Sequence, residues 1–92
     1  MTDIDKIREA IDKTDTELID LLARRFSFSE MIGEIKRAEG IPVIQSERFD
    51  QLKTSRKEHA RKAGLTEEFT EEFLNLIHRE SVRIQQGSRK EE

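Results

Sequence analysis

The chain has 92 residues, of which 40% are charged and 34% apolar, enough for one small domain with a single lean core. Its net charge of −3 argues against a general nucleic-acid binder, and the absence of cysteine excludes disulfides and thiolate chemistry. No apolar run approaches the ~18 residues of a membrane span and the N-terminus lacks a signal-peptide pattern, so we expect a cytoplasmic protein with no membrane partner.

The first predicted element is a single long helix from about residue 3 to about residue 38. Apolar residues recur along it at spacings of three and four, and no proline interrupts them. Thr2 and Asp5 form a capping-box pattern at its start. Gly40 followed by Pro42 predicts the end of this helix.

The length of this helix has a consequence for assembly. At a rise of 1.5 Å per residue it spans about 50 Å, whereas a compact domain of this size has a radius of gyration of about 12 Å. The remaining residues cannot cover the apolar stripe over that length. The sequence therefore predicts that a second chain covers it, most simply in a symmetric homodimer.

Two shorter helices are predicted after the proline-bearing connection. The second starts near Ser46 and ends near Gly64, and Thr66 can cap the third. We expect one helical domain over residues 1–86 and a disordered tail over residues 87–92. The fold class is all-α, a three-helix subunit with one very long N-terminal helix.

Polar side chains interrupt the apolar stripes of the first and third helices. On a seven-residue register Arg25 occupies a seam position of the first helix, and Arg8 and Lys36 line one flank. The stripe of the third helix continues at spacing four to Ser81 and Gln85. The charged side chains of the first helix either snorkel to solvent, or set the register of a helical dimer, or form a cationic pocket between helices. Ser81 and Gln85 fit that pocket or an ordinary helix end that turns toward solvent.

Arginine is well suited to a cationic pocket because its planar guanidinium group can bind a carboxylate by two hydrogen bonds. Arg48, one turn into the second helix, opposes the helix dipole, so a nearby anion would help, although it also fits a surface position. Arg25 and Lys36 lie about 16 Å apart along the axis and can converge on one small molecule. Arg8 lies about 25 Å from Arg25 and would serve a site built mainly by the other subunit.

Four segments together carry a family resemblance: "IREAIDKTDTELIDLLARR", "IGEIK", "IPVIQSERFDQL" and "IHRESVRIQQ". Over about residues 4–86 the chain resembles the all-helical chorismate mutases. The resemblance implies an intertwined homodimer with two equivalent active sites and no cofactor or metal. Its substrate would be chorismate, a small dicarboxylate that such enzymes convert to prephenate.

The resemblance also assigns roles to polar positions of this chain. It implies that Arg8 of the partner subunit and Arg25 bind the substrate carboxylates, and that Lys36 donates a hydrogen bond to the ether oxygen. Gln85 would be the second donor to that oxygen. The positions of Arg48 and Ser81 are also filled as the family requires.

Two positions depart from the family pattern. Many members carry an acidic residue where this chain has Gln45, and a glutamate where it has Phe49. That glutamate helps to hold the ring hydroxyl of the substrate, and a phenyl ring cannot. A backbone carbonyl near Gln45 could still accept from that hydroxyl, so we expect altered hydroxyl recognition and retained activity.

Other functions stay open at this point. An isochorismate-pyruvate lyase would use a similar scaffold and pocket, although Gln85 and the overall match favour the mutase. A non-catalytic helical dimerisation or regulatory module would need the apolar stripe but not the six polar positions. The "PVIQSER" segment is also similar to mutase domains fused to another enzyme of the aromatic pathway, which suggests fusion or association. His59 and His78 fall on different predicted helices and read as surface or boundary residues.

Overall fold

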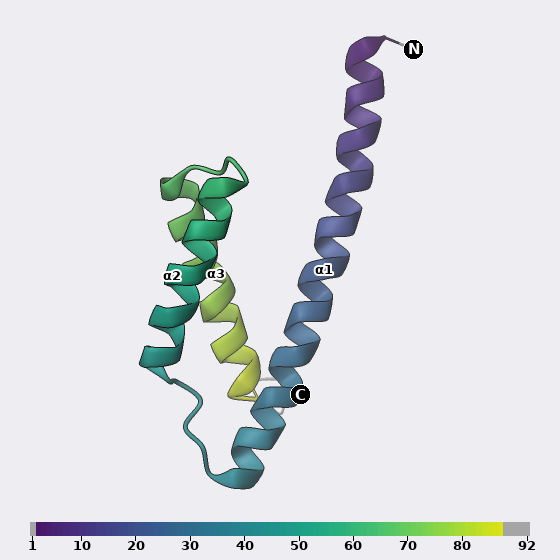
Figure 1. Ribbon diagram of the computed structural model, residues 1–92. Coiled ribbons are helices and arrows are strands. Elements are labelled where there is room, and N and C mark those ends of the chain that lie inside the picture. The colour runs from purple at the N-terminus through teal and green to yellow at the C-terminus, as the bar shows by residue number, and fades with distance from the viewer. Residues whose placement is uncertain (1, 88–92) are drawn as a thin grey trace.

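Three helices in chain order make up the computed structural model, which describes residues 2–87. They are α1 (Asp3–Glu39), α2 (Ser46–Lys62) and α3 (Glu67–Gln85). In Figure 1, α2 and α3 form a hairpin beside the second half of α1, while the first half of α1 extends beyond them. Within residues 2–87 there is no strand, so the predicted all-helical, three-helix subunit is confirmed.

Caps confirm both predicted ends of α1 and the predicted start of α3. The Thr2 hydroxyl accepts from the Asp5 N–H while the Asp5 carboxylate accepts from the Thr2 N–H, which completes a capping box. Gly40 ends α1 in the left-handed conformation, with φ of 69°. The Thr66 hydroxyl accepts from the Phe69 N–H at the start of α3. These local signals set the 37-residue length of α1.

The helix α3 packs against both other helices. Its buried residues Leu74 and Ile77 form the small core together with Ala60 of α2. Gly33 of α1 lies against the end of α3, and a Cβ atom there would be 2.8 Å from the Gln85 Cα. Glycine at this point therefore lets the two backbones approach more closely than a side chain would allow.

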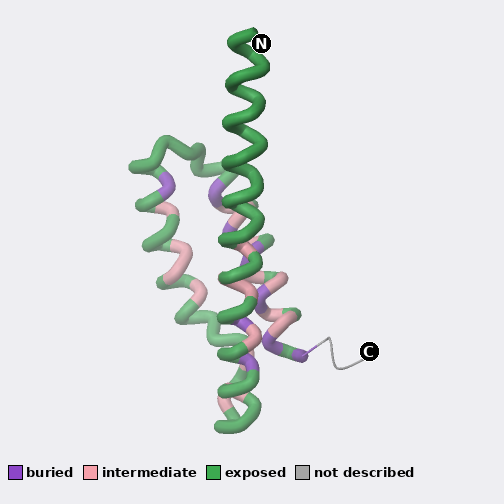
Figure 2. Tube along the Cα trace, turned by 90° about the vertical axis from the view of Figure 1, so that its right-hand side faces the viewer, coloured by how far each residue is buried: buried purple, intermediate pink, exposed green. Residues whose placement is uncertain are grey.

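The first half of α1 has no cover from its own chain. Every residue from 2 to 21 is exposed (Figure 2), including Ile4 and Ile7, which are 60% and 61% exposed. The molecule measures 56 × 33 × 16 Å, and its radius of gyration of 16.7 Å exceeds the ~12 Å of a compact chain of this length. As predicted, α1 is too long for the rest of its own chain to cover.

In the part of the chain that the structure describes, no helix is both long and apolar enough to span a lipid bilayer. Residues 88–92 of the predicted tail lie outside the described residues. The boundary between domain and tail stays a prediction.

Candidate active site

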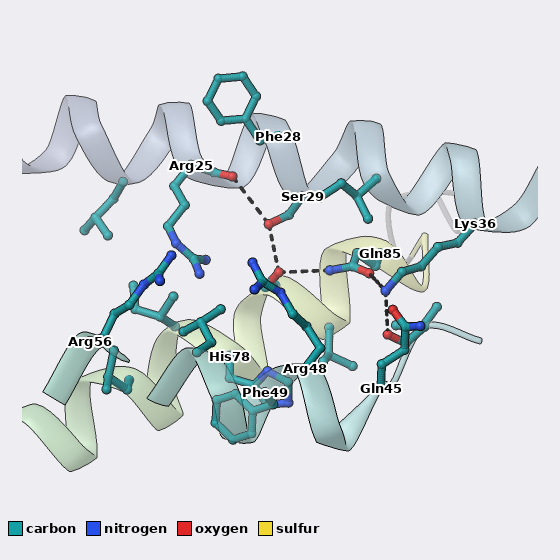
Figure 3. Close-up of a pocket in the computed structure, with 18 of the residues that line it drawn as sticks. Arg25, Phe28, Ser29, Lys36, Gln45, Arg48, Phe49, Arg56, His78 and Gln85 are labelled. Carbon is teal, nitrogen blue, oxygen red and sulfur yellow. Dashed lines mark hydrogen bonds between the residues drawn. The ribbon is translucent and has the colours of Figure 1, made fainter. Parts of the chain in front are cut away.

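A cavity of about 560 Å³ lies between the second half of α1, the hairpin of α2 and α3, and the loop that joins α1 to α2. This volume is in the range of small-molecule sites. Figure 3 shows side chains from all three helices pointing into it. Part of its wall is apolar and comes from Leu22, Ile32, Leu52, Leu74, Ile77 and Val82.

Four cationic side chains line this cavity: Arg25 and Lys36 from α1, and Arg48 and Arg56 from α2. No aspartate or glutamate lines it among the described residues. The cavity therefore carries an excess of positive charge that residues 2–87 do not neutralise locally. Such a site is suited to a ligand with more than one negative charge.

A chain of hydrogen bonds runs along the floor of the cavity (Figure 3). Lys36 Nζ donates to Gln85 Oε1 at 2.8 Å, and Gln85 Nε2 donates to Ser81 Oγ at 3.1 Å. The hydroxyls of Ser81 and Ser29 are 2.8 Å apart, and Ser29 Oγ donates to the Arg25 carbonyl at 3.4 Å.

The direction of this chain follows from its donors. An ammonium group cannot accept a hydrogen bond, so the amide must present its oxygen to Lys36 and its NH₂ to Ser81. Ser81 accepts from Gln85 Nε2, and either hydroxyl can be the donor in the bond between Ser81 and Ser29. The Gln85 amide thus has one orientation and is preorganised for a ligand.

The Lys36–Gln85 end of this chain of hydrogen bonds is tied to neighbouring backbone at two points. Lys36 Nζ also donates to the Val43 carbonyl at 2.8 Å, which fixes the loop after α1. Arg37 Nη1 donates to the Gln85 carbonyl at 2.8 Å, which fixes the end of α3. Lys36 therefore uses two of its three N–H donors, and the Gln85 amide uses one of its two. Within residues 2–87, one proton of each group is therefore left for a ligand.

Burial and mutual repulsion act on the cations of the cavity. Burial lowers the pKa of the Arg25 guanidinium, and the positive charges of Arg56 and Arg48 lower that pKa further. Burial also lowers the pKa of the Lys36 ammonium. An anionic ligand would relieve both effects, since it supplies the missing opposite charge.

An aromatic pair forms another part of the wall. The rings of Phe49 and His78 are stacked, with centroids 3.6 Å apart and planes inclined by 12°. Burial lowers the pKa of His78, and the positive charges of Arg25 and Lys53 lower that pKa further. His59 is exposed, as expected of a surface residue, whereas His78 is half-buried and lines the cavity.

The structure brings together six of the seven residues that sequence reasoning singled out for the site, and all six line the cavity: Arg25, Lys36, Gln45, Arg48, Ser81 and Gln85. Arg8 does not, because it lies on the exposed first half of α1. Sequence reasoning missed Arg56, although its spacing of eight from Arg48 places both on one face of α2. Among residues 2–87, no cluster of three or more side chains could hold a metal ion.

Comparisons with known proteins give matches over most of the chain. A family model described as chorismate mutase type II matches residues 7–86. The chain is 32% identical over 81 residues to a T-protein of Enterobacter agglomerans, covering 88% of this chain but only 22% of that protein. It is 26% identical to a 4-amino-4-deoxychorismate mutase of Streptomyces venezuelae, covering 90% of this chain and 81% of that protein.

A further relative is the chorismate mutase of Methanocaldococcus jannaschii, which is 36% identical over 58 residues and covers 59% of each chain. No solved structure matches the chain significantly.

Proposed function

Because the chain belongs to the chorismate mutase type II family, we propose that it rearranges chorismate to prephenate. The observation that carries this proposal is the cationic cavity, in which Lys36 and the Gln85 amide lie side by side and no acidic residue of the described chain takes part. The chain spans only 22% of the length of the T-protein relative. The activity is therefore stated as a proposal and is not transferred from that relative.

The proposed reaction needs positioning and charge more than proton transfer. Within one molecule a carbon–oxygen bond breaks as a carbon–carbon bond forms, and no nucleophile or base takes part. The flexible dicarboxylate must be held folded so that the reacting carbons are close, which removes an entropic part of the barrier. Two fixed carboxylate-binding groups on opposite walls of the cavity would do this.

Arg25 and Arg48 are well placed for the carboxylates within one subunit. Arg25 enters the cavity from α1 and Arg48 from α2, so they approach a bound ligand from different sides (Figure 3). Ser81 also lines the cavity and has a hydroxyl oxygen that can accept a hydrogen bond. Arg8 of the partner subunit is the proposed further carboxylate-binding group.

Lys36 and Gln85 are the proposed donors to the ether oxygen. As the carbon–oxygen bond breaks, negative charge builds up on that oxygen, so fixed donors stabilise the transition state more than the substrate. Each of the two groups retains one unused N–H, and their mutual hydrogen bond holds them adjacent. The partial burial that lowers the pKa of Lys36 strengthens this electrostatic effect, because charges interact more strongly in a less polar environment.

The ring substituent of the substrate separates two candidate reactions. The relative from Streptomyces venezuelae is named for 4-amino-4-deoxychorismate, whose amine would be charged at neutral pH. In this cavity such an ammonium would meet four cations and no carboxylate of the described chain. We therefore favour chorismate, with its neutral hydroxyl held by the backbone near Gln45 beside the Phe49 ring.

A homodimer is the proposed assembly. The exposed isoleucines on the first half of α1 lie on one apolar seam with Phe28, Ile32 and Ile35 of the second half, which are also exposed, and a second copy offers the matching seam. In that dimer the first half of α1 would reach the cavity of the partner and bring Arg8 to it. The helix length and the distance of Arg8 from the cavity of its own subunit support this arrangement.

Fusion or association with another enzyme of the aromatic pathway is proposed as well. The small share of the T-protein relative that this chain covers supports it, because a similar segment there lies within a much longer protein.

The direct test is to follow chorismate disappearance and prephenate formation with the purified protein. Catalysed formation of prephenate is the expected result. Release of pyruvate from isochorismate, with no action on chorismate, would favour the lyase reaction instead. If neither substrate reacts, a bicyclic dicarboxylate that mimics the transition state is added at millimolar concentration, and an unchanged melting temperature would favour a non-catalytic module.

A further inference from the structure

The cavity contains a second pair of facing arginines that neither the family resemblance nor the comparisons explain. Arg25 projects from α1 and Arg56 from α2, and their guanidinium groups point toward one another in Figure 3. The helix α2 runs antiparallel to α1 (Figure 1), so Arg56 lies at the Arg25 end of the cavity and Gln45 at the Lys36 end.

Several other cations of α2 are paired with carboxylates, whereas the four that line the cavity have no ion pair among the described residues. Lys53 and Lys57, on the same helix as Arg56, both form ion pairs with Glu71. Further along α2, Arg61 pairs with Glu58. Neither Arg25 nor Arg56 has an ion pair with a carboxylate among the described residues.

Two facing guanidinium groups without an anion repel one another. The positive charge of Arg56 lowers the pKa of Arg25, and its effect is larger than that of Arg48. The protein therefore carries an electrostatic cost at this end of the cavity when it is empty. A carboxylate between the two forks would remove that cost and accept hydrogen bonds from both.

We propose that Arg56 is a substrate-binding residue that holds, together with Arg25, one carboxylate of the dicarboxylate substrate within a single subunit. This rests on the proposed function. It differs from an arrangement in which Arg25 and Arg8 of the partner subunit are the only arginines at that carboxylate. Each subunit would then carry its own two-arginine clamp, and the partner's Arg8 would complete it.

The first test is steady-state kinetics of Arg56→Ala with chorismate, beside Arg61→Ala as a matched control. The control removes the same charge from the same helix at an exposed site outside the cavity. A clamp that binds substrate and transition state alike raises KM and leaves kcat nearly unchanged. We expect kcat/KM of Arg56→Ala to fall about 10- to 100-fold, with Arg56→Lys intermediate because it keeps the charge and loses the fork.

The second test separates binding from a structural role. The affinity of the bicyclic dicarboxylate is compared with those of two analogues in which one or the other carboxylate is replaced by a neutral amide. In wild type both replacements weaken binding, whereas in Arg56→Ala the replacement at the clamped carboxylate should weaken binding less than it does in wild type, and the other replacement should weaken it equally in both. Without ligand, Arg56→Ala should melt no lower than wild type, since a like charge has been removed.

The outcomes are distinguishable. If wild type neither converts chorismate nor binds the dicarboxylate, the proposed function fails and the clamp with it. If wild type is active but Arg56→Ala matches Arg61→Ala in kcat/KM, or loses affinity equally for both analogues, only the role of Arg56 is overturned.

Discussion

The two halves of α1 share one apolar pattern but have different surroundings. Residues 22–39 pack on α3 and contribute Arg25, Ser29 and Lys36 to the cavity. Residues 2–21 are all exposed, although isoleucines continue the seam there. A single helix can therefore form a site with its own chain at one end and remain uncovered at the other. We interpret the uncovered half as belonging to the site of a second subunit.

The largest expected effect comes from removing the ammonium group of Lys36, on the packed half of α1. Lys36→Ala takes away a fixed donor to the ether oxygen, and such losses typically lower kcat by about 100- to 1000-fold. Lys13→Ala removes the same charge from the exposed half and is the control. Measured kcat values should differ strongly between the two variants while both stay helical by circular dichroism. Equal turnover in the two would remove Lys36 from the proposed mechanism.

Changing Gln85 to glutamate should alter the pH dependence. A neutral amide donates at any ordinary pH, whereas a carboxylate donates only when it is protonated. Wild-type activity should therefore be nearly flat between about pH 6 and 8, a range in which Arg and Lys remain charged.

The activity of Gln85→Glu should be low at pH 8 and rise as the pH falls and the carboxyl group becomes protonated. Initial rates across this range, with folding checked at each pH, provide the measurement. A flat profile for the variant would mean that the side-chain N–H is not needed.

Gly33→Ala tests the close approach of the packed half to α3. Its new Cβ would lie 2.8 Å from the Gln85 Cα and 2.9 Å from the Gln85 carbonyl oxygen, so the backbone of α3 must move. Overpacking of this kind costs about 1–3 kcal/mol, against a gain of up to about 1 kcal/mol in helix propensity. Thermal unfolding should show a lower melting temperature, and kcat should fall because the amide is displaced. An increase in melting temperature would mean that the helices separate easily at this point.

The smallest effect concerns His78. Burial, Arg25 and Lys53 lower its pKa below the ordinary 6.5. Between the two pKa values the unfolded chain binds more protons than the folded one, so His78 contributes stability above about pH 6.5 that is lost as the pH falls through the lowered pKa. Denaturant unfolding at pH 7 and pH 5 should show a smaller loss for His78→Leu than for wild type. An equal loss would assign the pH dependence to other groups.

Much of the fold was predictable because its signals are local. The capping box at Thr2, the left-handed Gly40 and the cap at Thr66 each act within one turn, and they set both ends of α1 and the start of α3. Together with apolar periodicity, the first two signals predicted the length of α1 and hence the lack of cover. Polar residues on an apolar stripe indicated where Arg25, Lys36, Ser81 and Gln85 would meet.

The rest of the site depends on contacts between helices that no local pattern specifies. The hydrogen bond between Ser29 and Ser81 requires α1 and α3 to approach as closely as Gly33 allows. The stack of Phe49 on His78 requires α2 and α3 to face each other at one register. The spacing from Arg48 was enough to place Arg56 on the same face of α2, but only the antiparallel course of α2 places Arg56 opposite Arg25.

The central claim, that the two halves of α1 serve sites in different subunits, is tested most directly by mixing two inactive variants. Arg8→Glu damages the exposed half and Lys36→Ala the packed half, and each alone should have little activity. After the subunits are exchanged in equal amounts, about half of the dimers are mixed and each of these has one intact site, so about a quarter of wild-type activity should return. No recovery, with mixed dimers demonstrated by mass spectrometry, would contradict the account.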